Sequence, residues 1–266
     1  MEIFLDKFMS ERDLHIELKE KLGFPDYYGG NLDALNDCLD EIETLDVDIY
    51  ISDENIENKT IDDIIHIFEE RAGKSSDFSF RIHQEEFLNI MDKNENITNN
   101  TKPRSLVHRD GDLHMTAHIW IIKRIDTSLY VLLQKRSKSK LLYSGLYDVS
   151  SAGHISAGEE ARYSAVRELE EELGIKADPR NLEYIGNDKA ESTFITPDGK
   201  QITDREITTI YVYNKHIDID SLKLQESEVE SVCWFDVDEC IARIDDESFP
   251  NCIRLSELKK LKKKIL

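Results

Sequence analysis

Three glutamates in the stretch RELEEEL, residues 167–173, are spaced to share one face of a helix. Glu168, Glu171 and Glu172 fall at i, i+3 and i+4, and side chains at these spacings are neighbours on a helix surface. Like charges at this distance repel one another. A hard divalent cation would remove the repulsion, because Mg²⁺ binds a few carboxylates together with substrate phosphates. The spacing therefore predicts a carboxylate metal site.

The surrounding residues fit a loop followed by a helix. Arg167 can bridge to a nearby glutamate and orient it. Apolar residues that recur every four positions predict the buried face: Ala161, Ala165, Leu169 and Leu173. Glycines permit a tight loop before the helix and suit its C-terminal end: Gly153, Gly158 and Gly174. The glutamates therefore lie on a face of the helix different from the buried one.

The complete spacing resembles the Nudix box. It runs Gly, five residues, Glu, seven residues, Arg-Glu-Leu, one residue, Glu-Glu, one residue, Gly-Ile. The matching residues are Gly153, Glu159, Arg167, Glu168, Leu169, Glu171, Glu172, Gly174 and Ile175. The resemblance extends over residues 105–250 and implies an enzyme that hydrolyses a diphosphate linked to another group, X, using Mg²⁺ or Mn²⁺.

The same resemblance implies roles for individual residues. Arg167 would hold the metal cluster in place against Glu159, and it counts with the glutamates as catalytic. The implied metal ligands are Glu168, Glu171, Glu172 and Glu206. Metal ions would bind the phosphate oxygens and lower the pKa of the attacking water, and a carboxylate would accept its proton. Glu168 and Glu206 are both candidates for this base, and an exposed charge at a strand end is the alternative for Glu206.

A branch within the family is indicated by three segments, VHRDGDLHMTAHIWII, LLQKRS and LYDVSSAGH, which resemble proteins close to isopentenyl-diphosphate isomerase. The isomerase has a catalytic cysteine where this chain has Ala152, before Gly153 and His154. This absence and the intact glutamate box favour hydrolysis over isomerisation. His108, His114 and His154 resemble histidines that bind a metal in the isomerase, and purely structural histidines are the alternative.

An acidic helix is predicted near the N-terminus by FPDYYGGNLDALNDCLDEI, residues 24–42. Two glycines make a loop, and Asn31 can cap the helix that follows. Asp33, Asp37 and Asp40 lie at i, i+4 and i+7 on one face, where they could meet a cluster of arginines and lysines. A solvated face is the alternative.

The segment LKEKLGFPDYYGGNLDALNDCLDEI resembles barstar, an intracellular inhibitor of a secreted ribonuclease, and the resemblance covers residues 1–90. It implies binding of a basic ribonuclease. The implied partner-binding residues are Tyr27, Asp33, Asn36, Asp37 and Glu70. Asn36 stands where barstar has a tryptophan, and Gly30 where it has an acid. Because aromatic anchors dominate many interfaces, we expect weaker binding to a standard barnase than barstar shows.

Charge is distributed unevenly along the chain. The formal net charge is -21, and residues 1–100 hold 26 acidic and 9 basic side chains. Such a surface repels nucleic acid and attracts a basic partner, although plain solubility is an alternative explanation. We therefore expect no direct contact with nucleic acid.

The predicted fold class is α/β and α+β. Residues 1–92 are expected to form a barstar-like three-layer α/β domain, residues 93–106 a linker, and residues 107–266 a Nudix α/β/α sandwich with a mixed sheet. Strands 45–52 and 78–82 flank a helix and predict a parallel pair. The further predicted elements are strands at 116–123, 129–136, 208–215 and 229–235, and helices at 236–244 and 258–266.

Several classes of protein are disfavoured. No apolar run approaches the ~20 residues of a membrane span, and the first residues lack the pattern of a secretory signal. The four cysteines show neither CxxC spacing nor a disulfide framework, which favours the reducing cytoplasm. The leading prediction is a metal-dependent hydrolase of a nucleotide or other organic diphosphate. The alternatives are a ribonuclease-binding antitoxin whose Nudix domain is a scaffold or sensor, and an isopentenyl-diphosphate isomerase.

Overall fold

A computed structural model describes residues 1–6, 9–53, 58–196 and 199–265. The chain divides into two compact units, which we name after the resemblances in the sequence: the barstar unit (residues 1–88 and 99–107) and the Nudix unit (residues 89–98 and 108–266). None of the helices in the described ranges has the length and hydropathy that crossing a membrane requires.

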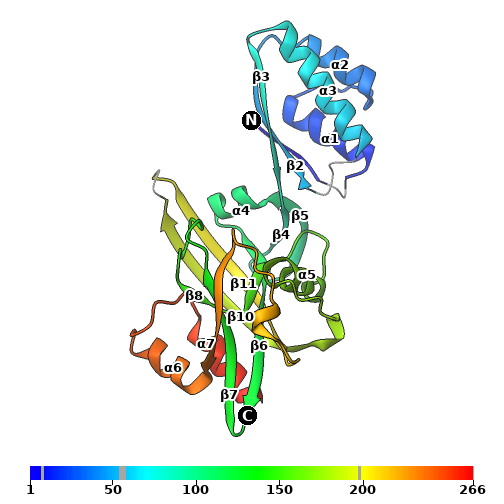
Figure 1. Ribbon diagram of the computed structural model, residues 1–266. Helices are drawn as coiled ribbons and strands as arrows, with labels where there is room; N and C mark the ends of the chain where they lie inside the picture. Colours follow the sequence, from blue (N-terminus) through cyan, green and yellow to red (C-terminus); the bar gives the residue numbers. More distant parts are fainter. Residues whose placement is uncertain (7–8, 54–57, 197–198, 266) are drawn as a thin grey trace. The chain divides into compact units, whose positions relative to one another are not determined.

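The barstar unit is a three-stranded parallel sheet with helices packed on it (Figure 1). Its strands, in the order β1-β2-β3, are β1 (Glu2–Leu5), β2 (Leu45–Ser52) and β3 (Phe78–Glu85). Its helices are α1 (Glu11–Leu22), α2 (Leu32–Asp40) and α3 (Lys59–Lys74). Val47 and Ile49 of β2 are fully buried in the core that the helices share, as the period of two predicts. The predicted parallel pair, β2 and β3, is present.

The acidic helix α2 begins where the sequence predicts. The side chain of Asn31 caps it, because its Oδ1 accepts a hydrogen bond from the Ala34 N–H at 2.8 Å. Leu35 and Leu39 pack into the core, which turns Asp33 and Asp37 to solvent.

Residues 93–106 form regular structure where the sequence suggests a linker. They include the turn and second strand of a hairpin, β4 (Phe87–Met91) and β5 (Ile97–Pro103), and the start of α4 (Arg104–Asp110). The polar composition encodes the turn, since Asp92 Oδ1 accepts from the N–H groups of Asn94 and Asn96 at 2.8 and 2.9 Å. The predicted limits of the two domains stay predictions.

The Nudix unit is built on a mixed sheet. The main strand order is β10-β11-β6-β7-β12, with β9 beside β6 and β8 beside β7. β6 and β11 are parallel, and the other pairs are antiparallel. The strands are β6 (Leu113–Ile125), β7 (Ser128–Arg136), β8 (Tyr147–Asp148), β9 (Ser151–His154), β10 (Leu182–Ile195), β11 (Gln201–Tyr213) and β12 (Val229–Asp236).

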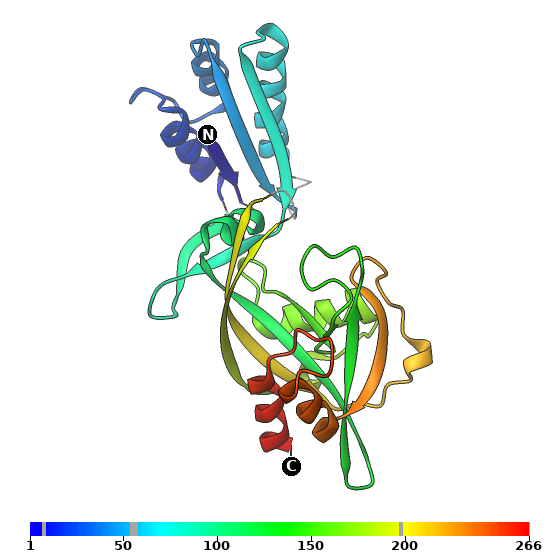
Figure 2. The same ribbon diagram turned by 90° about the vertical axis from the view of Figure 1, so that its left-hand side faces the viewer.

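Helices cover both faces of this sheet, as a sandwich requires (Figure 2). α5 (Ala161–Leu173) packs on the face that carries Ala117 and Ile119 of β6. α6 (Val237–Asp245) and α7 (Leu255–Ile265) pack on the face that carries Trp120. Alternate residues of β6 thus enter different cores.

Candidate functional site

The helix with the clustered glutamates is α5. Ala165, Leu169 and Leu173 are fully buried, as their spacing predicts. Gly174 ends the helix at φ 72°, and its N–H donates to the carbonyl oxygens of Leu169 and Glu170. The buried stripe therefore fixes the rotation of α5 and the direction of its carboxylates.

Arg167 of α5 forms ion pairs with three carboxylates. Its Nη1 lies 3.1 Å from Glu168 Oε1 and 3.4 Å from Glu171 Oε2, and its Nε lies 3.6 Å from Glu159 Oε2. The predicted contact with Glu159 is thus present. One guanidinium offsets part of the repulsion among these carboxylates and fixes their positions.

Glu168 lies directly against Gly153 of β9. A Cβ atom built on Gly153 would come within 2.1 Å of the Glu168 carboxyl carbon, which no real structure tolerates. Arg167 also reaches β9, because its Nη2 donates to the His154 carbonyl oxygen at 3.4 Å. The first glycine of the box thus leaves the space that the Glu168 carboxylate occupies, so a side chain at this position would displace that carboxylate.

Glu172 has a different environment from Glu171. Glu172 is 5% exposed, and its Oε2 accepts a hydrogen bond from the Ala152 N–H at 3.2 Å. Burial raises the pKa of Glu172 to about 7, against the backbone hydrogen bond from Ala152, which lowers it. Glu171 is largely exposed. A cation beside Glu172 would compensate for the cost of its buried charge.

A second cluster lies on the face of the sheet that does not carry α5. Neighbours across strands share a face, and the register pairs Thr116 with both His154 and Thr208, and His114 with Glu206. His108 and His154 approach to 3.3 Å between their Nε2 atoms, and His114 Nε2 lies 3.5 Å from Asp204 Oδ1.

Two groups of three residues in this cluster could each hold a metal ion, because within each group one ligand atom per residue lies within 4.8 Å of the other two. The groups are His108, His114 and His154, and His114, Asp204 and Glu206. Imidazole and carboxylate together suit a divalent transition metal. Glu206, predicted to join the glutamates of α5, thus lies in the histidine cluster. Asp204 was missed by the sequence argument, although its place two residues before Glu206 on one strand would have indicated it.

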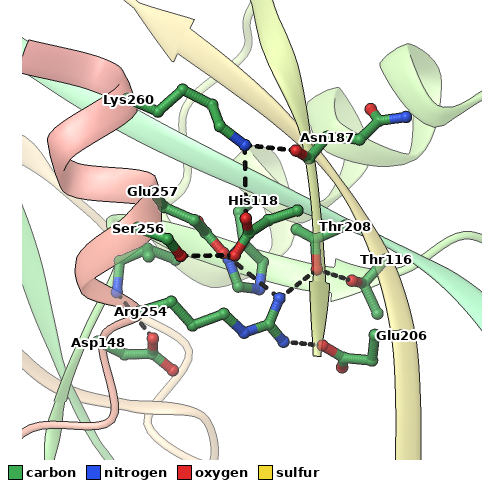
Figure 3. A network of polar contacts seen from close by, with 12 residues as sticks. Thr116, His118, Asp148, Asn187, Glu206, Thr208, Arg254, Ser256, Glu257 and Lys260 are labelled. Atoms are coloured by element: carbon green, nitrogen blue, oxygen red, sulfur yellow. Dashed lines mark hydrogen bonds and ion pairs between the residues drawn. The ribbon is translucent and has the colours of Figure 1, made fainter. Parts of the chain in front are cut away.

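Glu206 is buried and forms an ion pair with Arg254 (Figure 3). Burial opposes ionisation of Glu206, but the positive charge of Arg254, with smaller contributions from His118 and His114, holds its pKa below the usual value. The alternative of an exposed charge at a strand end is therefore wrong for Glu206.

The residues implied as partner contacts in the barstar unit lie on its surface. Tyr27 is 77% exposed, Asp33, Asp37 and Glu70 are exposed, and Asn36 is half-buried. Asp40, on the same helix, lies 3.7 Å from Arg71 Nε and 3.8 Å from Lys74 Nζ. Two neighbouring cations therefore already offset the charge of Asp40.

Comparisons with known proteins match both units. The model of the NUDIX domain matches residues 112–252, and the model of Barstar (barnase inhibitor) matches residues 1–84. An uncharacterized Nudix hydrolase of Clostridium acetobutylicum is 40% identical over 164 residues, which are 62% of this chain and 76% of that protein.

Two further relatives correspond to the two resemblances in the sequence. An isopentenyl-diphosphate Delta-isomerase of Cutibacterium acnes is 26% identical over 62% of this chain and 79% of its own length. A putative ribonuclease inhibitor, YrdF, of Bacillus subtilis is 38% identical over 24% of this chain and 75% of its own length. Because the NUDIX match covers more than half of the sequence, this chain belongs to the Nudix family and carries a barstar domain at its N-terminal end.

Proposed function

We propose that the Nudix unit hydrolyses a nucleotide or another organic diphosphate, with Mg²⁺ or Mn²⁺ held by the carboxylates of α5. Membership of the Nudix family implies hydrolase activity on diphosphates, and divalent metal ions are generally needed for it. The observation that carries the proposal is the pairing of Arg167 with Glu159, Glu168 and Glu171 beside the glycine that accommodates Glu168.

Each residue of the proposed site has a distinct proposed role. Glu168, Glu171 and Glu172 would hold the cation, which would supply charge neutralisation at the phosphate and a lower pKa for the attacking water. Arg167 keeps two of these carboxylates in place. We propose Glu168 rather than Glu206 as the proton acceptor, because Glu168 lies on the helix that carries the proposed metal ligands, whereas Glu206 pairs with Arg254 in the histidine cluster.

We propose a second cation site formed by His108, His114, His154 and Asp204, with Glu206 at its edge. Its support is the short distances among these ligand atoms, which lie on four different elements. Nitrogen ligands distinguish this site from the all-oxygen site on α5, so Mn²⁺ or Co²⁺ suits it better than Mg²⁺.

The test of hydrolysis is a phosphate-release screen of the full chain against nucleotide and isoprenoid diphosphates with Mg²⁺ or Mn²⁺. We expect turnover of at least one substrate and none in EDTA. Turnover that persists in EDTA, or no turnover of any diphosphate by a chain that binds Mn²⁺, would contradict the proposal.

Isomerisation of isopentenyl diphosphate is disfavoured because Ala152 cannot supply a thiol. Ala152 pairs with His118 across β6 and β9, so the two side chains share the face of the histidine cluster. We expect no allylic product when the full chain is incubated with isopentenyl diphosphate and the products are separated by chromatography. Rapid formation of the allylic isomer would contradict this assignment.

We propose binding of a basic, barnase-like ribonuclease as a second function, carried by the barstar unit. The exposure of Tyr27, Asp33 and Asp37 on one loop–helix segment supports it. Titration of the full chain into such a ribonuclease by calorimetry tests it, with affinity expected to fall as salt rises. The absence of heat at low salt would exclude this partner.

The proposed compartment is the cytoplasm. The four cysteines, Cys38, Cys233, Cys240 and Cys252, are all free, in accord with a reducing environment. Recovery of the native protein with oxidised cysteines would count against it.

A further inference from the structure

The segment that leads into α7 places a guanidinium next to the histidine cluster. Arg254 lies just before the helix, and its side chain reaches β11, where it pairs with Glu206 (Figure 3). The Glu206 carboxylate that receives it also lies within 4.8 Å of ligand atoms of His114 and Asp204. One carboxylate therefore pairs with Arg254 and also belongs to the candidate cation site.

Arg254 is itself held by several groups. Its Nη1 donates to Thr208 Oγ1 at 2.5 Å and lies 3.4 Å from Glu257 Oε1. Thr208 and Glu206 are two residues apart on β11 and so share a face. The fork of the guanidinium thus bridges two side chains of one strand, and this geometry fixes the orientation of the Glu206 carboxylate.

Glu257 extends this support to β6. It is fully buried, and its Oε2 lies 2.9 Å from His118 Nδ1. A buried carboxylate without partners would be costly, so its contacts with Arg254 and His118 are needed for it to stay in this position. The network therefore joins α7 to the neighbouring strands β6 and β11.

We propose that Arg254 is a positioning residue for the second cation site. It orients Glu206 toward His114 and Asp204, and Glu257 in turn holds Arg254. The inference rests on the proposed second site. Partners that hydrogen-bond to a ligating carboxylate set its orientation, and their loss typically lowers metal affinity about 10- to 100-fold. Arg254 and Glu257 also lie beyond residues 112–252, so the match to the family model does not include them.

A purely mechanical role is the competing explanation, in which Arg254 only fastens α7 to the sheet. Lys260 provides the matched comparison, because it lies on the same helix and its Nζ is 3.4 Å from Asp188 Oδ1 of β10. Lys260 therefore also ties α7 to the sheet, but through a carboxylate outside the histidine cluster.

The experiment is a Co²⁺ titration of the full chain, followed by the visible absorption that distinguishes nitrogen from oxygen ligands. The variants are Arg254→Met, Arg254→Lys, Glu257→Gln and Lys260→Met, each with its melting temperature. We expect Arg254→Met to raise the Co²⁺ dissociation constant about 10- to 100-fold. Arg254→Lys and Glu257→Gln should give smaller increases, and Lys260→Met less than about a twofold change even where its melting temperature falls, because it touches no ligand.

Two outcomes would overturn the inference in different ways. Unchanged Co²⁺ affinity in Arg254→Met, with lowered melting temperatures in both Arg254→Met and Lys260→Met, would show that Arg254 only anchors α7. If the Co²⁺ spectrum of His114→Gln were the same as that of the wild type, the second cation site would not exist. The inference would then fail with it.

Discussion

In the barstar unit the carboxylates of Asp33, Asp37 and Glu70 lie in water, whereas in the Nudix unit Glu172 and Glu206 are buried. An exposed carboxylate ionises without cost, acts over the ~8 Å Debye length and is screened by salt. A buried carboxylate needs fixed partners, such as Arg254 for Glu206. The first arrangement suits attraction of a large basic partner, and the second suits binding of a small ion in one geometry.

The largest expected effect concerns the proposed metal ligands of α5. Glu168→Gln or Glu172→Gln should lower kcat/KM by about 1,000-fold, or about 4 kcal/mol, because a neutral amide binds Mg²⁺ poorly. Steady-state phosphate release at saturating Mg²⁺ measures it. Glu170→Gln is the control on the same helix, since Glu170 is exposed and pairs with Lys176. Equal rates in the ligand variants and in the control would refute the assignment.

The second effect is a pH dependence of stability due to Glu172. The pKa of Glu172 rises from 4.5 to about 7 on folding, so the folded chain binds this proton more tightly. The contribution is complete below pH 4.5 and is lost as the pH rises through about 7, a change of about 3 kcal/mol in the free energy of unfolding.

Urea unfolding in EDTA at several pH values measures this loss. Glu172→Gln stays neutral at every pH and should lack the decline between pH 4.5 and 7. Parallel profiles for the two proteins would show that Glu172 does not titrate in this range.

A third effect tests the exposed carboxylates. If the barstar unit binds a barnase-like ribonuclease, Asp37→Ala should weaken binding about 30-fold, or ~2 kcal/mol, because a charged contact near the interface centre is lost. Asp40→Ala should change affinity less than about threefold, since Arg71 and Lys74 already offset Asp40 and rim charges contribute little. Calorimetry of the full chain measures both, and equal losses would contradict the placement of the interface.

The smallest expected effect comes from a steric clash at Gly153 rather than from the loss of a charge. Gly153→Ala would put a methyl group where the Glu168 carboxylate lies, so we expect about a tenfold loss of kcat/KM, since a small displacement of a positioned group is costly. Gly73→Ala in the barstar unit is the control, because nothing lies within 4 Å of its added Cβ. An unchanged rate in Gly153→Ala would show that Glu168 can shift without consequence.

Much of the fold and part of the site follow from the sequence. The box spacing predicts α5, its buried stripe and the contact of Arg167 with Glu159, because all of these depend on residues close in the chain. The strand–helix–strand order predicts the parallel pair of β2 and β3. The glutamates of α5 are predicted as metal ligands, and this assignment stays a prediction.

The remainder depends on contacts between distant residues. Arg254 and Glu206 are 48 residues apart, and only the parallel pairing of β6 with β11 brings Glu206 beside His114. β10 contains the polar run NDKAEST and half of its residues are exposed, so its pattern gives a weak strand signal. The polar stretch after Met91 contains a turn held by Asp92, and composition alone does not distinguish such a turn from a linker.

The route of the chain between residues 89 and 107 has a practical consequence for dissecting this protein. Residues 89–98 belong to the Nudix unit, and the following residues 99–107 return to the barstar unit. A single cut within this range therefore cannot separate the two units cleanly. One of the two fragments carries residues that belong to the other fragment's unit, and that unit lacks them. A protease or a gene truncation that separates the halves there would therefore yield at least one unit with a missing strand, and a fragment's loss of function would not show that the function needs both halves.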